Sequence, residues 1–466
     1  MIESSDDVIG PESDGIAVQV VEANEYLDGP SGEGNRWNPY DHMDDYDIED
    51  LNEIRFISGK ERTRRKIKYR FCRVDWEEHV DMLIYTNQFQ QRFRMEDWMF
   101  DDLLRELEDA LTVSVRHSMS STNGNEPIYP HIIIACGLRF LTGDSITSLS
   151  DLYGMSVAST RRIINMFLDA VDFNETCDDL QIKLPDPKNM AELNHLAGRW
   201  ADVSTVYGLM NGHLAAMDGW APRTEMPRNE PNQADYYSGH YQMYSLNIQA
   251  MCDPDLIFLY MSVAGPGKIN DIRAFSRLKG LREWFDLLPD TFFASADNAY
   301  PLSRKILIPF SGSSSGIECN RTYNYYLSQL RIRIEMAFGL LTTKWRRLRM
   351  TLNFSVAKNA QIIRVCMKLH NFVIRKKMER GGGKIPRFEG DTVDPRKYGI
   401  DAIISDNPNQ CSRFGFLETS NKDDDDIPVT PASSLFFTDC SRRSEMIADI
   451  KHRPIRRPQF NIDRND

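Results

Sequence analysis

Three acidic residues lie at positions from which their carboxylates could converge on one site. Asp218 ends an apolar run, Asp297 ends a later one, and Glu335 lies 38 residues further on in a helical pattern. Converging carboxylates repel one another unless a cation cancels their charge. Mg²⁺ and Mn²⁺ are hard cations that prefer oxygen ligands, and two such ions can activate a nucleophile and stabilise the leaving oxygen of a phosphodiester. The three acids therefore predict a divalent-metal site for phosphodiester chemistry.

Three further observations bear on whether these acids form a metal site and on which other metal sites the sequence could contain. The chain has 68 acidic residues, and an Asp before a Gly at a strand end is often only a turn residue, so spacing alone leaves both interpretations open. The eight cysteines are scattered singly with no CxxC pair, which argues against a zinc site or a disulfide framework and fits reduced thiols inside a cell. His370 lies on an apolar helical stretch, which favours a structural histidine.

The elements around the acids follow a recognisable order. Apolar runs and turn residues predict strands near 213–217, 244–251, 257–263 and 291–296, a helix at 271–281 and later helices at about 325–348 and 359–377. Three strands, a helix, a fourth strand and further helices form the order of an α/β, RNase H-like core. We expect this core to occupy residues 201–380.

An all-α region is predicted before this core, at residues 91–200. A helix that ends at Gly154 is followed by a turn and a second helix from Val157, which is a helix-turn-helix arrangement. The second helix is expected to present Ser159, Arg161 and Arg162 outward to DNA. An ordinary helical hairpin is the alternative.

The charge distribution separates the ends of the chain from its middle. Residues 1–50 hold 15 acids and one base and are expected to be disordered, residues 51–90 include a basic arm or linker, and residues 381–466 are expected to be a loosely structured tail. Residues 331–380 hold 13 bases and two acids, an excess that suits a polyanion. A solvated basic helix face is the alternative. We find no apolar run of the roughly 18 residues that a membrane span needs.

Within the basic segment, three arginines are candidates for phosphate contact. Arg331 lies one turn before Glu335, and Arg346 lies about three turns after it on the predicted helix, so both are expected on the helix face of that acid. Arg347 is the third. Guanidinium groups suit phosphate better than ammonium groups do.

Residues 215–375 resemble the DDE endonuclease domain of PIF/Harbinger transposases and of nucleases derived from them. Six motifs in order carry the resemblance, at residues 216–219, 237–250, 264–271, 296–302, 331–341 and 369–372. By motif, Asp218, Asp297 and Glu335 match the catalytic and metal-binding acids. Asp271 matches a further acid, which is either a metal ligand, a substrate contact or a simple helix cap.

This resemblance implies a nuclear enzyme that cuts double-stranded DNA and joins strands with Mg²⁺ or Mn²⁺. Family members often work with a separate Myb-like DNA-binding protein, and no such domain is evident in this chain. The alternative function is a domesticated protein that binds DNA or a partner, like a transcription factor, without cutting. The target DNA sequence and the oligomeric state do not follow from the motifs.

Overall fold

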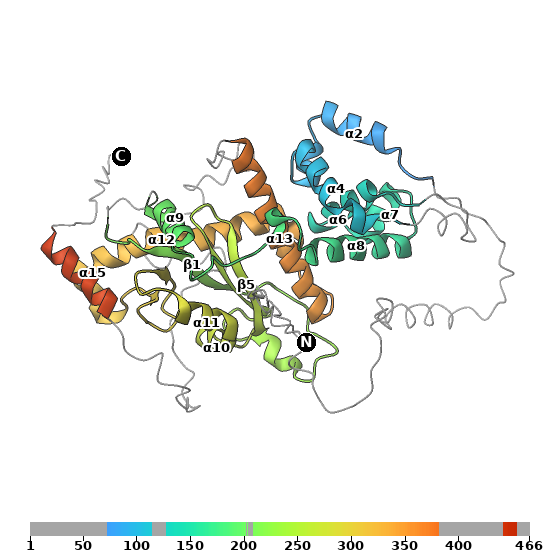
Figure 1. Cartoon of the computed structure of the whole chain (residues 1–466). Helices are drawn as coiled ribbons and strands as arrows, with labels where there is room; N and C mark the ends of the chain where they lie inside the picture. Colours follow the sequence, from blue (N-terminus) through green and yellow to red (C-terminus); the bar gives the residue numbers. More distant parts are fainter. Residues whose placement is uncertain (1–71, 114–126, 202, 204–207, 382–440, 454–466) are drawn as a thin grey trace, which may run out of the picture.

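The computed structural model describes residues 72–113, 127–201, 203, 208–381 and 441–453. A group of helices forms the N-terminal part, and a sheet flanked by helices forms the rest (Figure 1). The predicted acidic segment at 1–50 and residues 51–71 of the predicted basic arm or linker lie outside the described residues. Within the described ranges, no helix combines the length and apolarity needed to cross a bilayer.

The N-terminal part is all helical, as its periodicity predicts. Its helices bury one apolar stripe each; in α4, Leu103, Leu107 and Leu111 recur every four residues and are fully buried. The helices are α2 (Trp76–Tyr85), α3 (Phe89–Phe93), α4 (Asp97–Leu111), α6 (Pro130–Leu141), α7 (Ile146–Leu152) and α8 (Val157–Asp172).

A tight turn connects α7 and α8. Gly154 has φ +60°, and a Cβ at this position would lie 1.8 Å from the carbonyl oxygen of Cys72, so only glycine fits. Ser156 caps α8 by accepting from the backbone N–H of Ser159. The Ser159 hydroxyl accepts from Ser156 at 2.9 Å and is half-buried, so this side chain takes part in the cap of α8. Arg161 and Arg162 are exposed, as expected.

The sheet is mixed and has five strands in the order β5-β4-β1-β6-β7. The β5-β4 and β4-β1 pairs are antiparallel, and the β1-β6 and β6-β7 pairs are parallel. The strands are β1 (His213–Trp220), β4 (Leu246–Cys252), β5 (Phe258–Pro266), β6 (Phe293–Ser295) and β7 (Ile306–Leu307), with a separate short pair, β2 (Tyr237–Ser238) and β3 (Met243–Tyr244). The predicted strands are present, and β7 adds an edge strand that the sequence pattern does not reveal.

Helices cover the sheet and connect it to the N-terminal part. α9 lies against β1, where the Trp200 indole donates to the Leu214 carbonyl at 2.7 Å. The stretch predicted as one helix at 271–281 forms two, because the helix is interrupted at Leu278. The helices are α9 (Met190–Ala201), α10 (Asp271–Arg277), α11 (Lys279–Leu287), α12 (Glu318–Lys344), α13 (Val356–Arg380) and α15 (Ser441–His452).

α13 lies between the N-terminal helices and the sheet (Figure 1). Arg364 on α13 donates two hydrogen bonds of 2.5 Å each to the buried carboxylate of Asp172 on α8. A bidentate pair of this kind fixes orientation as well as distance. The two parts of the chain are therefore held together by specific polar contacts in addition to apolar packing.

Arg347 is one of these connectors, which corrects its predicted role. α12 ends at Lys344, earlier than the predicted 348, and residues 346–349 form a 3-10 turn, η5. Arg347 is buried, donates to the carbonyl oxygens of Phe140 and Asp144 at 3.2 and 2.6 Å, and lies over the Phe140 ring. It is thus committed to packing and does not face DNA. Arg346 is exposed, but it is not on the helix of Glu335, so the expected three-turn alignment is wrong.

Asn371 shows how α13 closes the open edge of the sheet, and it gives a stability prediction. Its side chain accepts from the Phe258 N–H and donates to the Phe258 carbonyl, each at 2.8 Å, in the fully buried interior. Asn371→Ala leaves both backbone groups of β5 unsatisfied, and we expect a loss of about 2–4 kcal/mol in the free energy of unfolding. Chemical denaturation measures this. Asn353→Ala, outside α13, is the control, and an equal effect of the two substitutions contradicts the assignment.

Candidate active site

Asp218 lies where the central strand leaves the hydrophobic core. The preceding residues of β1 are buried on both faces, and exposure begins at Asp218. In the parallel pairing, Ala216 is opposite Ser295, so Asp218 and Asp297 each lie two residues beyond the same rung. Neighbouring strands are about 4.8 Å apart, so the register brings the two carboxylates to one place.

Glu335 reaches the same place from α12, which packs across β1. Arg331 lies between the two acids: its Nη1 is 2.7 Å from Glu335 Oε1 and 3.9 Å from Asp218 Oδ2. The Asp218 and Glu335 oxygens can therefore be no further apart than these two distances combined. All three of these side chains are between 16 % and 24 % exposed, so the cluster is partly shielded from water but open on one side.

Asp271 is the fourth acid, and its placement bears on one of the three roles left open by the sequence, that of a helix cap. Asn270, and not Asp271, caps α10 by accepting from the Arg273 N–H at 3.0 Å. The Asp271 carboxylate instead points at β4, where Gln249 and Asn247 donate to its Oδ1 at 2.8 and 3.3 Å. Asp271 is therefore not the side-chain cap of α10, and its charge acts on Asp297, which leaves the roles of metal ligand and substrate contact.

Gly219 makes room for this fourth acid. Gly219 is opposite Gln249 in the β1-β4 pairing. A Cβ on Gly219 would lie 2.4 Å from Asp271 Oδ1 and 2.9 Å from Gln249 Nε2. The residue after the first acid must therefore lack a side chain for Asp271 to approach the strand.

A chain of hydrogen bonds from Tyr300 through Gln249 holds Asp271 in position. The sequence analysis did not single out these supporting residues. The buried Tyr300 hydroxyl donates to Gln249 Oε1, and Gln249 Nε2 donates to Asp271 and to Asn247 Oδ1. This chain of hydrogen bonds fixes the amide so that its N–H groups face the acid. The signal was present in the sequence, because these three residues lie within the motifs at 237–250 and 296–302.

The electrostatics of the cluster follow from burial and from like charges. Burial, and then the neighbouring Asp297, raise the pKa of Asp218 well above its usual range, and Arg331 opposes this effect. Burial, and then Asp271, raise the pKa of Asp297. Burial also raises the pKa of Asp271, although the Asn247 and Gln249 donors counteract it. The carboxylates therefore repel one another when they are ionised, and the Arg331 guanidinium counteracts this repulsion at Asp218 and Asp297.

This repulsion predicts how the thermal stability of the protein depends on pH when EDTA removes metal ions. Because folding raises the pKa of Asp218, the folded chain binds the proton more tightly than the unfolded chain. The resulting stability is fully present below the unfolded pKa, near 4, and is lost as the pH rises through the folded pKa. Asp218→Asn removes this loss, so its Tm should exceed that of the wild type increasingly from pH 4 to pH 8. Thermal melts measure the difference, and a pH-independent difference argues against a strained acid.

The donor set fits a hard divalent cation, although the side chains do not form a finished metal site. Carboxylate oxygens from Asp218, Asp297, Asp271 and Glu335 are the ligands that Mg²⁺ and Mn²⁺ prefer. In the described part of the chain, however, no three such side chains are positioned to share one ion as they lie. The Arg331 guanidinium stands between two of these acids, Asp218 and Glu335. It would have to withdraw for a cation to bind between those two carboxylates.

The stretch that carries the acid cluster also shows similarity to a known protein family. Residues 217–371 match the family described as DDE superfamily endonuclease. The matched region begins next to Asp218 and ends at Asn371. It thus contains the end of β1, all four acids and most of α13.

Two relatives extend the similarity beyond this region. The chain is 24 % identical over 321 residues to "Protein ALP1-like" of Arabidopsis thaliana, covering 65 % of this chain and 75 % of the relative. It is 25 % identical over 315 residues to "Putative nuclease HARBI1" of Xenopus laevis, covering 64 % of this chain and 86 % of the relative. No solved structure matches the chain significantly.

Proposed function

We propose that the protein is a metal-dependent DNA endonuclease or transposase of the PIF/Harbinger type, which hydrolyses phosphodiester bonds and transfers strands by a two-metal mechanism. The observation that carries the proposal is the convergence of Asp218, Asp297 and Glu335 within the region that matches the DDE superfamily endonuclease family. The strand order, with three antiparallel strands followed by two parallel ones, supports an RNase H-like core.

Each acid has a distinct part in this proposal. Asp218 and Asp297, side by side at neighbouring strand ends, would hold Mg²⁺ or Mn²⁺, with Glu335 and Asp271 completing the oxygen ligands. The bound ions would supply Lewis-acid activation of a water or 3′-hydroxyl and charge neutralisation at the phosphate. The chain's own contribution is rigidity: the β1-β6 register and the hydrogen bonds from Tyr300 through Gln249 hold the acids before any ligand arrives.

Arg331 would have two positions in this mechanism. Without metal, its guanidinium stands between Asp218 and Glu335 as a counter-ion. With a cation held by the acids, the guanidinium would be repelled and could contact a substrate phosphate, which its planar fork suits. The same residue would thus delay metal binding and help hold the DNA.

A metal titration without DNA tests the first position. We expect Arg331→Gln to bind Mn²⁺ about tenfold more tightly than the wild type, because a positive charge close to the ligands is removed. Isothermal titration calorimetry measures the affinity directly. Arg321→Gln is a matched control, since Arg321 is on the same helix and pairs with Glu318 far from the acids. Equal or weaker metal binding by Arg331→Gln contradicts the counter-ion role.

Other basic residues would contact DNA outside the acid cluster. Arg161 and Arg162 are exposed on α8, the second helix of the predicted helix-turn-helix, and Arg346 is exposed beside the α6-α7 connection. This grouping supports a double-stranded substrate contacted by both parts of the chain. We further propose that the protein acts in the nucleus, with a separate Myb-like protein as the partner for site recognition.

A second function is favoured by the Arg331 ion pair itself. A guanidinium that stands permanently between two acids would suit a domesticated protein that binds DNA or a partner without cutting. The two proposals differ in one measurement. Purified full-length protein should nick supercoiled DNA with Mg²⁺ or Mn²⁺ and not with EDTA. Binding without metal-dependent nicking, across DNA from several sources, would leave the non-cleaving function.

A further inference from the structure

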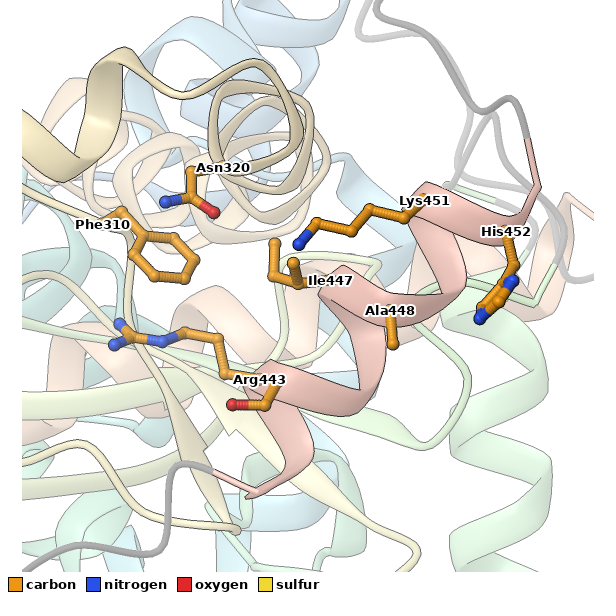
Figure 2. Close-up of a pocket in the computed structure, with 8 residues that line it drawn as sticks. Phe310, Asn320, Arg443, Ile447, Ala448, Lys451 and His452 are labelled. Carbon is orange, nitrogen blue, oxygen red and sulfur yellow. The ribbon is translucent and has the colours of Figure 1, made fainter.

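α15 forms an open basic pocket where it docks on the start of α12. The pocket has a volume of about 560 Å³ and is lined mainly by α15 together with Phe310 and Asn320. Figure 2 shows Lys451 extending back along α15 toward Asn320, with Arg443 lying by Phe310. The volume far exceeds that of one water, about 30 Å³, so a group as large as a phosphate with its sugar fits.

The docking of α15 is specific. Arg442 donates to the carbonyl oxygens of Asn211 and Thr291 at 3.1 and 2.7 Å and lies over the Phe293 ring. Met446 and Ile450 are buried beneath the helix. The pocket is therefore a fixed feature of the nuclease part, formed by a segment about 60 residues beyond the end of α13.

The charge of the pocket is one-sided. Its lining includes Arg443, Lys451 and His452 and no acidic residue. The acids of α15 are engaged elsewhere, because Glu445 faces Arg304 and Asp449 pairs with Arg453. Among the residues that the structure describes, no carboxylate lies within ion-pairing distance of Arg443 or Lys451. In sequence the positive charge continues, since residues 451–458 contain four Lys or Arg and no acid.

Arg443 is also held in a defined position. Its guanidinium lies 4.0 Å from the Phe310 ring centre and is 3.5 Å from the Ile308 carbonyl oxygen. A stacked guanidinium keeps its charge and loses less side-chain entropy when it binds an anion. This distinguishes the pocket from a solvated helix face, on which basic side chains would be unconstrained.

The position of the pocket along α12 indicates which anion it serves. Asn320 and Glu335 are 15 residues apart on one helix, which corresponds to about 22 Å along the axis and about 60° around it. DNA advances about 3.4 Å per base pair, so this distance spans roughly six or seven pairs. A duplex with one phosphate at the acids could therefore place another phosphate of its backbone in the pocket.

We propose that the α12-α15 pocket is a second DNA-backbone site, which holds a phosphate roughly half a helical turn from the one to be cut. The inference rests on the proposed nuclease function for its choice of ligand. Arg443 and Lys451 neutralise the phosphate without reading bases. The C-terminal helix thus positions the substrate, and cutting itself depends on the acids.

Equilibrium binding to a 30-base-pair duplex tests the site independently of cleavage. In full-length Asp218→Asn protein with Ca²⁺, Lys451→Gln should weaken binding about three- to tenfold on every sequence and lower the salt slope by about one. Lys279→Gln, which removes an equal charge from α11, where Lys279 faces Glu283, is the matched control and should change neither quantity. Lys451 is exposed at the helix end, so its substitution should not disturb docking.

The outcomes separate this site from the nuclease proposal. A reduced slope for Lys451→Gln supports the site even if the wild-type protein cuts no DNA. If Lys451→Gln leaves both the DNA affinity and the salt slope unchanged, the site is rejected. The site is also rejected if Lys451→Gln weakens binding to a phosphopeptide but not to DNA. Arg443→Gln is the second variant, and hydrogen exchange of residues 441–452 checks that its α15 stays docked. If α15 stays docked and DNA binding is unaffected, the site is also rejected.

Discussion

Asp218→Asn is expected to lower the rate constant of metal-dependent DNA cleavage on the order of 10³-fold or more while the protein stays folded. The amide has nearly the same shape as the carboxylate but carries no charge to hold a cation. Asp218 is on the central strand and adjoins Asp297 in register, so the substitution removes one of two neighbouring carboxylates. Single-turnover cleavage of a supercoiled plasmid, with Mg²⁺ or Mn²⁺, measures the loss.

The control for this result is Asp286→Asn. Asp286 is exposed on α11 and undergoes the same chemical change away from the acid cluster, so its cleavage rate should match that of the wild type. The Asp218 variant should also melt at a higher temperature than the wild type in EDTA, which shows that lost activity does not come from unfolding. Cleavage by Asp218→Asn within a few fold of the wild-type rate would exclude Asp218 as a ligand.

The elements that carry the acids could be predicted because their sequence signals are strong and local. Within β1, residues 214–217 form a continuous apolar run, as expected for a strand buried on both faces, and this run ends at Asp218, the first acidic residue of the strand. On α12, Ile334, Phe338 and Leu341 are spaced by four and three and are fully buried. Trp345 follows the same spacing and is buried too, although the helix has ended. Spacing therefore located the core stripe correctly and the helix end wrongly.

Side-chain contacts between residues that are far apart in the sequence could not be predicted in this way. Arg347 and Arg346 are adjacent in one basic run, yet one is buried against Phe140 and the other is exposed. Nothing local distinguishes them, because the difference arises from the α6-α7 connection about 200 residues earlier. α15 was missed for a related reason: only Met446 and Ile450 of its 12 residues are buried, so its apolar periodicity is slight.

Gly219 and Asp271 are a second case in which the sequence shows the residues but not the contact between them. The sequence showed a glycine after the first acid and an acid after Asn270, and each had an ordinary explanation as a turn or a cap. Only the β1-β4 register, in which Gly219 is opposite Gln249, shows that the two residues depend on each other. The missing side chain is needed because the carboxylate occupies its space.

Gly219→Ala is therefore expected to lower cleavage about 100-fold or more although every acid is retained. The new methyl group would lie 2.4 Å from Asp271 Oδ1, so the carboxylate must leave the Gln249 and Asn247 donors that hold it. Misplacement of a positioned group by about 1 Å can cost this much in rate. The loss should appear in the rate constant and in Mn²⁺ affinity, with DNA affinity in Ca²⁺ nearly unchanged.

Two further variants show whether Asp271 carries this effect. Gly339→Ala adds the same methyl group on α12, one turn after Glu335, where nothing lies within 4 Å, and it should leave cleavage unchanged. Asp271→Asn should reproduce the loss caused by Gly219→Ala, and the double variant should be little worse than either single one, because both changes disable one group. If the two losses multiply in the double variant, Gly219 acts through something other than Asp271, and the fourth acid has no demonstrated part in metal binding.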